Sequence, residues 1–214
     1  MISITHTNAS SVWRQLSAPP QPRRGPPASP QQQPQRRAAG APPRALSGVP
    51  DADAPPFTKL NTPVYSLSSS GPGGGSPTLN IVTYASPIAI KPARKYALGL
   101  YVGTLSWQNV RDTGRCVLQI LQQSHSPLVP LLGKRSGRDV DKLREIEAMG
   151  FNVASAFGLP VLADHAGLME LRVASDFIPC GDHETVICDV VGWQDAKGPA
   201  APLYTAYLRQ TGFL

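Results

Sequence analysis

The first 50 residues contain no lysine and no acidic residue. They hold six arginines and ten of the 23 prolines, so they have too little apolar surface to offset the entropy of folding, and we expect disorder. An acid-free segment with arginine, serine and alanine has the composition of an organelle transit peptide, and its prolines would break the amphipathic helix of a mitochondrial signal. Residues 1–50 therefore predict a chloroplast transit peptide, with a mitochondrial signal or a simple disordered tail as alternatives.

The rest of the chain lacks an excess of charge of either sign. The formal net charge of +6 resides in the first 50 residues, because residues 51–214 hold 14 basic and 14 acidic side chains. A basic stripe of the kind that binds nucleic acid therefore has little support. Long apolar runs are also missing. None approaches the ~18 residues of a transmembrane helix, so we expect no insertion into a membrane.

Cysteine and histidine are scarce. The three cysteines share no C-x-x-C spacing and suit a reducing compartment, and Cys116 and Cys188 lie in apolar runs where we expect them to be buried. Outside the first 50 residues there are three histidines, and they lack the spacing of metal ligands, which act in groups of three or four. We therefore predict no metal site. No G-x-S-x-G motif is present, which argues against a hydrolase.

The glycine- and serine-rich stretch 66–77 lacks the G-K-[ST] ending of a phosphate-binding loop. It is typical of a flexible linker or an exposed loop, so we predict a linker and loop at 51–78 and a folded domain at 79–214. Apolar runs bounded by turn residues predict six strands in this domain. They are expected at 79–85, 95–103, 115–121, 167–174, 184–193 and 202–208. Prolines end the first of these, and the second is apolar enough to be buried on both faces.

Three short helices are expected between the strands. One covers 104–114, entered at Thr104 or Ser106 and closed by Gly114 in a left-handed conformation. A second covers 126–133, and a third covers 136–151, with Ser136 and Asp139 resembling a capping box. Because the strands do not alternate with long helices, the pattern predicts a mainly β fold with short helices, an α+β closed barrel rather than an open α/β sheet.

Two segments suit an anionic ligand. The strand-to-helix junction at 103–109 presents backbone N–H groups with Thr104, Ser106 and Asn109 at a helix N-terminus, as a phosphate monoester requires. The simpler interpretation is that Thr104 or Ser106 only caps the helix. The segment GKRSGRD (133–139) gathers three cations, among which we take Arg138 as a candidate cofactor ligand. A solvated basic turn explains this segment equally well.

Five motifs follow one another along the folded part of the chain. They are N-I-V-T-Y-A-S-P (80–87), G-T-L-S-W-Q-N-V-R-D-T-G-R-C-V-L-Q-I-L (103–121), S-G-R-D-V-D-K (136–142), L-P-V-L-A-D (159–164) and C-G-D-H (180–183). Their order resembles the flavin reductase-like family, the FMN-binding split-barrel group. The resemblance implies a six-stranded antiparallel barrel that forms a homodimer, with FMN in a groove near the subunit interface.

The resemblance also implies roles for individual residues. Three would approach the isoalloxazine ring from the end of the first barrel strand, where backbone groups can hydrogen-bond flavin N5 and O4. These are Thr83, Ala85 and Ser86. Thr104, Ser106 and Asn109 match the segment that holds the ribityl phosphate. This role agrees with the interpretation of the helix N-terminus given above.

The C-G-D-H turn stands immediately before an apolar run, and in the family it lies beside the flavin and is associated with the nicotinamide or the substrate. The resemblance therefore makes His183 the candidate catalytic residue, which would donate a hydrogen bond to the nicotinamide amide or a phosphate. Asp182 would hold the tautomer of the histidine and share the nicotinamide site. Alternatively, the turn only satisfies the local backbone of a hairpin.

Together these observations predict an FMN-binding oxidoreductase that transfers a hydride from NADH or NADPH to bound flavin. FAD in place of FMN stays open, as does flavin as a substrate rather than a tightly bound cofactor. The alternative is a split-barrel protein that binds flavin or another planar cofactor, such as a tetrapyrrole, without turnover. It is favoured by the segment 86–100, where isoleucine, lysine and proline replace the small polar element of well-characterised reductases.

Overall fold

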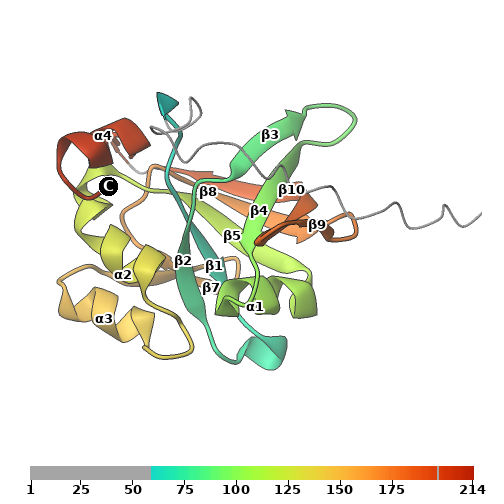
Figure 1. Ribbon diagram of the computed structural model, residues 1–214, viewed down its shortest axis with the longest axis horizontal. Coiled ribbons are helices and arrows are strands. Elements are labelled where there is room, and N and C mark those ends of the chain that lie inside the picture. The colour runs from blue at the N-terminus through green and yellow to red at the C-terminus, as the bar shows by residue number, and fades with distance from the viewer. Residues whose placement is uncertain (1–58, 197) are drawn as a thin grey trace, which may run out of the picture. The chain divides into compact units, whose positions relative to one another are not determined.

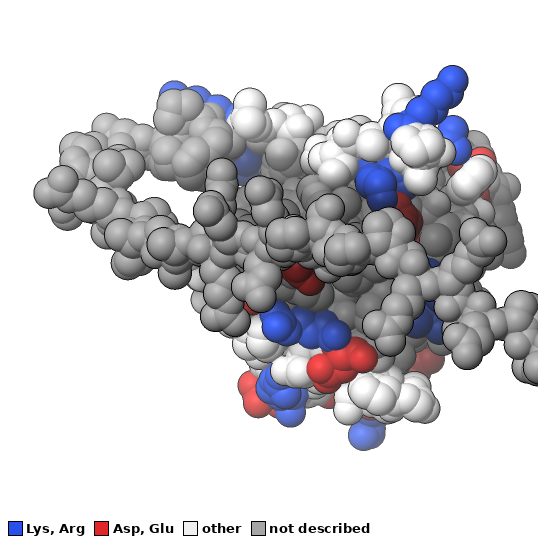
Figure 2. Space-filling model, turned by 90° about the vertical axis from the view of Figure 1, so that its right-hand side faces the viewer, with Lys and Arg blue, Asp and Glu red and all other residues white. Residues whose placement is uncertain are grey.

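The structure, a computed structural model, describes residues 59–196 and 198–214. They belong to one unit, which comprises residues 51–214. The predicted transit peptide, the disorder expected in 1–50 and the first residues of the predicted linker lie outside the described residues. Over the described part of the face in Figure 2, basic and acidic side chains are interspersed, in keeping with the balanced charge of this part of the sequence.

Eight strands form one antiparallel sheet that curls around an apolar interior (Figure 1). They are β1 (Tyr65–Ser69), β2 (Thr78–Val82), β3 (Ala85–Ala89), β4 (Lys95–Tyr101), β5 (Arg115–Ile120), β8 (Gly167–Val173), β9 (Ile178–Cys180) and β10 (His183–Asp195). The hydrogen-bonded order is β2-β1-β5-β8-β10-β4-β3, and β9 pairs with β10. Two further strands, β6 (Val153–Ala156) and β7 (Leu159–Leu162), form a separate hairpin.

The predicted mainly β fold with short helices is confirmed. The sheet curls into a split barrel, so it does not close as the strand pattern alone predicted. Its end strands β2 and β3 follow one another across residues 83–84 but do not pair with each other. The chain was expected to leave the sheet after residue 85. Instead, Ala85–Ala89 pairs with β4, with a bulge between Pro87 and Ala89. Proline lacks a donor N–H, and an edge strand such as β3 does not need that donor.

The stretch expected to be a linker contains the strand β1. All five of its residues are buried, and β1 pairs with β2 on one side and β5 on the other. Tyr65 and Leu67 join the interior cluster of the sheet. Serines suit the opposite face because β7 packs closely there, and the Ser68 hydroxyl donates a hydrogen bond to the Pro160 carbonyl at 2.5 Å. Serine content alone therefore gave a misleading signal of flexibility.

Burial along β4 corrects a second expectation, since the strand is buried on one face rather than both. Leu98 and Leu100 are buried in the interior, whereas Tyr101 is exposed. On the outer face, a Cβ at Gly99 would lie 3.0 Å from the Cβ of Tyr84, so the glycine allows the chain after β2 to approach closely. The Gly99 amide donates to the Tyr84 carbonyl at 2.7 Å.

The helix α1 (Leu105–Thr113) confirms its prediction at both ends. The Thr104 hydroxyl accepts a hydrogen bond from the Trp107 amide at 3.2 Å, and Gly114 closes the helix with a φ of 67°. The prediction of a helix over 126–133 is met by a 3-10 segment, η3 (Gln123–Leu128), followed by α2 (Val129–Lys134). A second 3-10 segment, η2 (Pro72–Gly74), lies in the glycine-rich loop.

Two helix predictions in the second half of the chain need correction. The helix α3 (Lys142–Ala148) begins six residues later than expected, because Asp141 rather than Ser136 caps it by accepting from two backbone amides. Residues 202–208 were expected to form a strand, but α4 (Thr205–Gln210) begins there. The backbone of Leu203 bonds to Val64 and Leu121, and the chain then turns into the helix, so only one residue of the stretch makes sheet-like contacts on both sides.

Three apolar clusters stabilise the unit. One fills the curled sheet, one lies between the sheet and the helices α2, α3 and α4, and a small one lies beneath the β6–β7 hairpin. Cys116 and Cys188 are 0% exposed within the first cluster, as predicted, and burial raises the pKa of the Cys188 thiol to about 12.

Among the described residues, the helices are too short or too polar to cross a bilayer.

Candidate functional site

Three hollows adjoin one another, each sharing lining residues with the next, and we call them together the groove. The first, the anion pocket, has a volume of about 460 Å³ and lies between the start of α1 and the segment that joins α2 to α3. A central hollow of about 260 Å³ shares Tyr101, Thr104 and Ser106 with it. The third, the aromatic pocket, has about 670 Å³ and shares Tyr84 and His183 with the central hollow. The groove therefore runs continuously from one end to the other.

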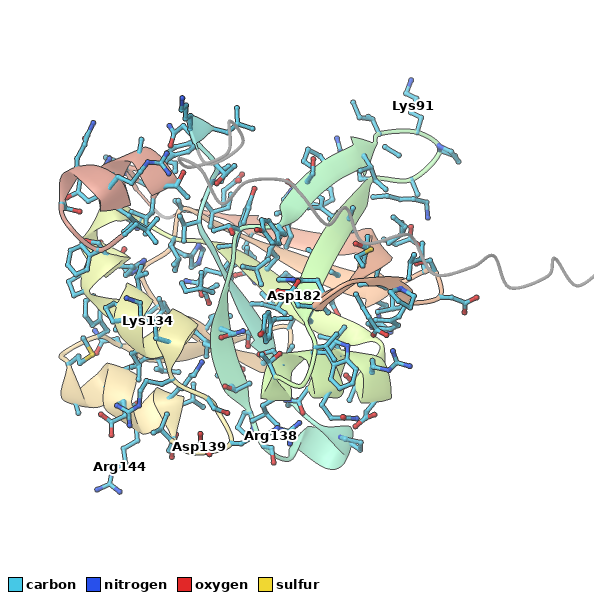
Figure 3. The ribbon with its side chains drawn as sticks, viewed as in Figure 1. Lys91, Lys134, Arg138, Asp139, Arg144 and Asp182 are labelled. Atoms are coloured by element: carbon cyan, nitrogen blue, oxygen red, sulfur yellow. The ribbon has the colours of Figure 1, made fainter. Side chains whose placement is uncertain are left out.

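The anion pocket carries three cations and no carboxylate among its lining residues. The cations are Lys134, Arg135 and Lys142. Figure 3 shows Lys134 on α2 and Asp182 at the tip of the β9–β10 hairpin, so the two ends of the groove come from different elements. Leu105 and Ser106, at the start of the nine-residue α1, line the same pocket, and the first amides of a helix have no partner within the helix. This donor set suits an anion.

Lys142 is the buried cation of the anion pocket. Its side chain is 3% exposed, and its Nζ donates to the Leu132 carbonyl at 2.8 Å and to Asn80 Oδ1 at 3.1 Å. An ammonium group has three N–H donors, so one is left for a ligand. Burial lowers the pKa of Lys142 from its ordinary value to about 8, so the group is still mostly charged at neutral pH.

The turn before α3 approaches β2 closely because residue 137 is glycine. A Cβ at Gly137 would lie 2.7 Å from the Thr78 hydroxyl and 3.2 Å from the Leu105 side chain. Real Cβ atoms do not come that close, so any larger residue would push the turn outward. The absence of a side chain at this position therefore brings the segment 133–137 against the start of α1.

The residues predicted to hold a phosphate have different surroundings. Ser106 is 3% exposed and lines both the anion pocket and the central hollow. Thr104 also lines both, but its hydroxyl already donates to the Tyr101 carbonyl at 2.8 Å and caps the helix. Asn109 lines none of the three hollows, and its amide donates to the Ser76 carbonyl at 3.0 Å. Its contacts hold the glycine-rich loop, and its binding role stays a prediction.

Arg138 lies beside the anion pocket rather than in it. Its Nε donates to the Gly103 carbonyl at 3.3 Å, which ties the turn before α3 to the loop before α1. It lines a separate, open hollow of about 680 Å³ together with Asp139 and Arg144 (Figure 3). In this position Arg138 supports the wall of the anion pocket. Direct contact between Arg138 and a cofactor stays a prediction.

The aromatic pocket gathers the remaining predicted residues. Thr83, Ala85 and Ser86 line it from the junction of β2 and β3, and Asp182 and His183 line it from the hairpin. His183 Nδ1 lies 2.7 Å from Asp182 Oδ1, as expected for a carboxylate that fixes the ring. Gly181 takes a φ of 75°, and the Val102 amide donates to the Asp182 carbonyl at 3.0 Å, so the hairpin turn is also well satisfied. The local geometry of the hairpin turn is thus satisfied, and the role of His183 and Asp182 toward a nicotinamide stays a prediction.

Two tyrosines flank the histidine. The rings of Tyr84 and Tyr101 each lie 5.1 Å from the His183 ring, both edge-on, and both tyrosines are more than half exposed. Flat rings at a groove favour a planar ligand, because an aromatic face can be covered by another. Neither the two tyrosines nor Lys142 were predicted from the sequence, although all three lie next to or within the quoted motifs.

Comparison with known proteins identifies the class. A family model described as the flavin reductase like domain matches residues 57–210, so the chain belongs to this family. The match confirms the resemblance found in the sequence. A comparison with curated proteins found no match.

Solved structures show the same fold, the FMN-binding split barrel. An FMN-binding protein from Thermus thermophilus, with bound p-hydroxybenzaldehyde, superposes with a TM-score of 0.60 at 17% identity, over 72% of this chain and 87% of that one. The flavin reductase of styrene monooxygenase from Pseudomonas putida S12 has a TM-score of 0.56 at 20% identity, over 69% and 88%. A similar chain from Sinorhizobium meliloti 1021 is longer, and the match spans 48% of it.

Proposed function

We propose that the groove binds FMN and that the protein is an NAD(P)H-dependent flavin oxidoreductase. The observation that carries the proposal is the continuity of the groove from a cationic end to an aromatic end. A phosphate ester on a flexible chain that ends in a planar ring matches this order of surroundings. Family membership and the flavin-related names of similar structures support the same class of ligand.

Each end of the groove would contribute differently. Lys142 and the amides at the start of α1 would bind the phosphate, with Lys134 and Arg135 at the rim of the pocket. Backbone groups near Thr83 and Ala85 would meet the edge of the isoalloxazine ring. His183 would hydrogen-bond the nicotinamide and help to exclude water from the stacked rings. Bound FMN would supply a hydride acceptor, and hydride transfer needs no acid or base from the chain.

An anaerobic absorbance spectrum tests the activity. The full chain is mixed with FMN, and NADPH and then NADH are added. We expect bleaching of the bound flavin, and the more effective donor gives the nucleotide preference. FAD is compared in a parallel titration. A protein that binds no flavin under these conditions would rule the proposal out.

A second candidate is a flavin- or tetrapyrrole-binding protein without turnover. It is supported by the segment that follows Ser86, where Ile88 and Ile90 are 50% and 74% exposed and residues 87–95 contain no serine or threonine. Bound flavin that stays oxidised with both NADPH and NADH would favour this candidate over the first.

We further propose that the protein is a homodimer. A patch of exposed apolar side chains on β10 and on β3 and its adjoining loop would be covered by a second copy. It consists of Ile88, Ile90, Val191 and Trp193. Light scattering should give twice the chain mass, and Trp193→Ser should shift the protein toward the monomer. A wild-type monomer at all concentrations would contradict this.

Import into chloroplasts is the remaining proposal, and it rests on the composition of residues 1–50. A fluorescent protein fused behind these residues should accumulate in chloroplasts. Accumulation in mitochondria would support the alternative signal, and an even distribution would indicate a plain tail.

A further inference from the structure

The hairpin that carries His183 is attached to the sheet through one of its two strands, because β10 pairs with β4 from His183, opposite Tyr101, onward. All three residues of β9 are exposed, and β9 pairs only with β10. At the tip, one backbone hydrogen bond from Val102 to Asp182 joins the hairpin to the loop before α1. The backbone of His183 is therefore held by β4, and side-chain contacts that tie the hairpin to α1 would further fix the histidine relative to the anion pocket.

Glu184, the residue after His183, supplies such contacts from the opposite face of the strand. Side chains alternate along β10, and Val186 and Cys188, which share the face of Glu184, are 0% exposed. The Glu184 side chain is only 15% exposed. Its Oε2 accepts a hydrogen bond from Trp107 Nε1 at 2.7 Å and from Arg111 NH1 at 2.5 Å.

Arg111 extends this link to the strand β9. Its guanidinium lies 4.9 Å from the ring centre of Phe177, the residue just before β9, and 5.4 Å from that of Trp107. Trp107 and Arg111 are one helical turn apart on α1. Both strands of the hairpin are therefore fastened to the helix whose first amides line the anion pocket.

We propose that Glu184, with Trp107 and Arg111, positions His183 relative to the anion pocket. Since α1 begins at that pocket and Glu184 adjoins His183, the network, together with the pairing of β10 and β4, sets the spacing between the two ends of the groove. Hydride transfer demands this spacing, because misplacement of the reacting groups by about 1 Å can cost on the order of 100-fold in rate. The catalytic consequence rests on the proposed function, whereas the anchoring of the hairpin does not.

The test uses two variants that remove opposite charges from the same ion pair, Glu184→Gln and Arg111→Met. Positioning predicts that both slow the reduction of bound FMN by NAD(P)H in the same direction, about 10-fold or more, with little change in the Kd for FMN. A purely electrostatic influence on the groove predicts rate changes of opposite sign. Trp107→Phe, which removes the indole N–H and keeps a ring, is a milder third variant in case either charge variant folds poorly.

Amide hydrogen exchange supplies a readout that needs no flavin. Glu184→Gln and Arg111→Met should speed exchange in peptides covering 101–104 and 178–183. The matched control is Asp189→Asn, which breaks the 2.5 Å ion pair between Asp189 and Lys95 further along the same strand and should leave these peptides unchanged. Unchanged exchange in both test variants, or rate effects of opposite sign, would overturn the proposal. Faster exchange in a protein that binds no FMN would support the anchoring and overturn only the proposed function.

Discussion

The two ends of the groove differ in how they are built. The anion pocket draws its cations from α2, the following turn and α3, a short span of sequence, and it offers charge and backbone amides. The aromatic pocket joins the β2–β3 junction, β4 and the β9–β10 hairpin, and it offers rings and one histidine. We therefore expect the two ends to act on a ligand in different ways. One end would hold a ligand by charge, and the other would orient it by shape.

Removal of the buried cation should have the largest effect. We expect Lys142→Met to weaken FMN binding about 10- to 100-fold, because a charge-assisted hydrogen bond to phosphate contributes about 1.5–3 kcal/mol. Lys134→Met at the rim is the matched control and should cost much less, because a flexible surface cation is screened by solvent. Fluorescence titration with FMN measures both. Equal losses in the two variants would show that the pocket acts only through its summed charge.

Replacement of the histidine should affect turnover rather than binding. We expect His183→Asn to lower the rate of flavin reduction by NAD(P)H about 10-fold, as for loss of a positioning group near the reacting atoms. The Kd for FMN should change little, because the anion pocket stays intact. Stopped-flow absorbance gives the rate, and Asp182→Asn, which keeps the shape of the turn, should have a smaller effect. If His183→Asn instead loses FMN without a change in the rate per bound flavin, the histidine belongs to flavin binding.

The pH dependence of binding distinguishes the two ends in the wild-type protein. Lys142 loses its charge as the pH rises through its pKa of about 8, so the Kd for FMN should increase between pH 7 and pH 9, by up to about 10-fold. The phosphate itself is fully ionised over this range, since its second pKa is about 6. Lys142→Met should flatten the profile. A slope that persists in this variant would assign the titration to another group.

The helix cap should give the smallest effect. Thr104→Ala removes the hydroxyl that caps α1 and should lower the free energy of unfolding by about 1 kcal/mol. Thr113→Ala, at the other end of the same helix, removes only a hydroxyl that donates to the Asn109 carbonyl and should cost less. Urea unfolding of the two variants gives the comparison. A larger loss for Thr113→Ala would contradict the assigned cap.

Features with a local cause could be predicted from the sequence. Thr104 and Gly114 marked both ends of α1, Gly181 marked the hairpin turn, and apolar neighbours marked the two buried cysteines. Each depends on residues close by in the chain. The motif order gave the family for a related reason, because a series of short local patterns is specific even when each pattern alone is weak.

Features that depend on distant contacts were missed. The strand β1 looks like a linker in the sequence because β7, which packs against it and accepts a hydrogen bond from Ser68, lies more than 80 residues further along the chain. In the sequence, Lys142 looks like an ordinary surface residue of a helix. Only in the folded chain does it lie against Asn80 and Leu132. Asn109 contacts the glycine-rich loop, which its local sequence does not show, and its phosphate-binding role stays a prediction.

A comparison of FMN with riboflavin would measure the contribution of the anion pocket to flavin binding. The two ligands share the isoalloxazine ring and differ in the phosphate, so their Kd values for the full chain separate the contributions of the two ends of the groove. The account predicts that FMN binds at least about 10-fold more tightly than riboflavin, and that Lys142→Met removes most of this difference. Equal affinity for the two ligands in the wild-type protein would contradict the assignment of the anion pocket to the flavin phosphate.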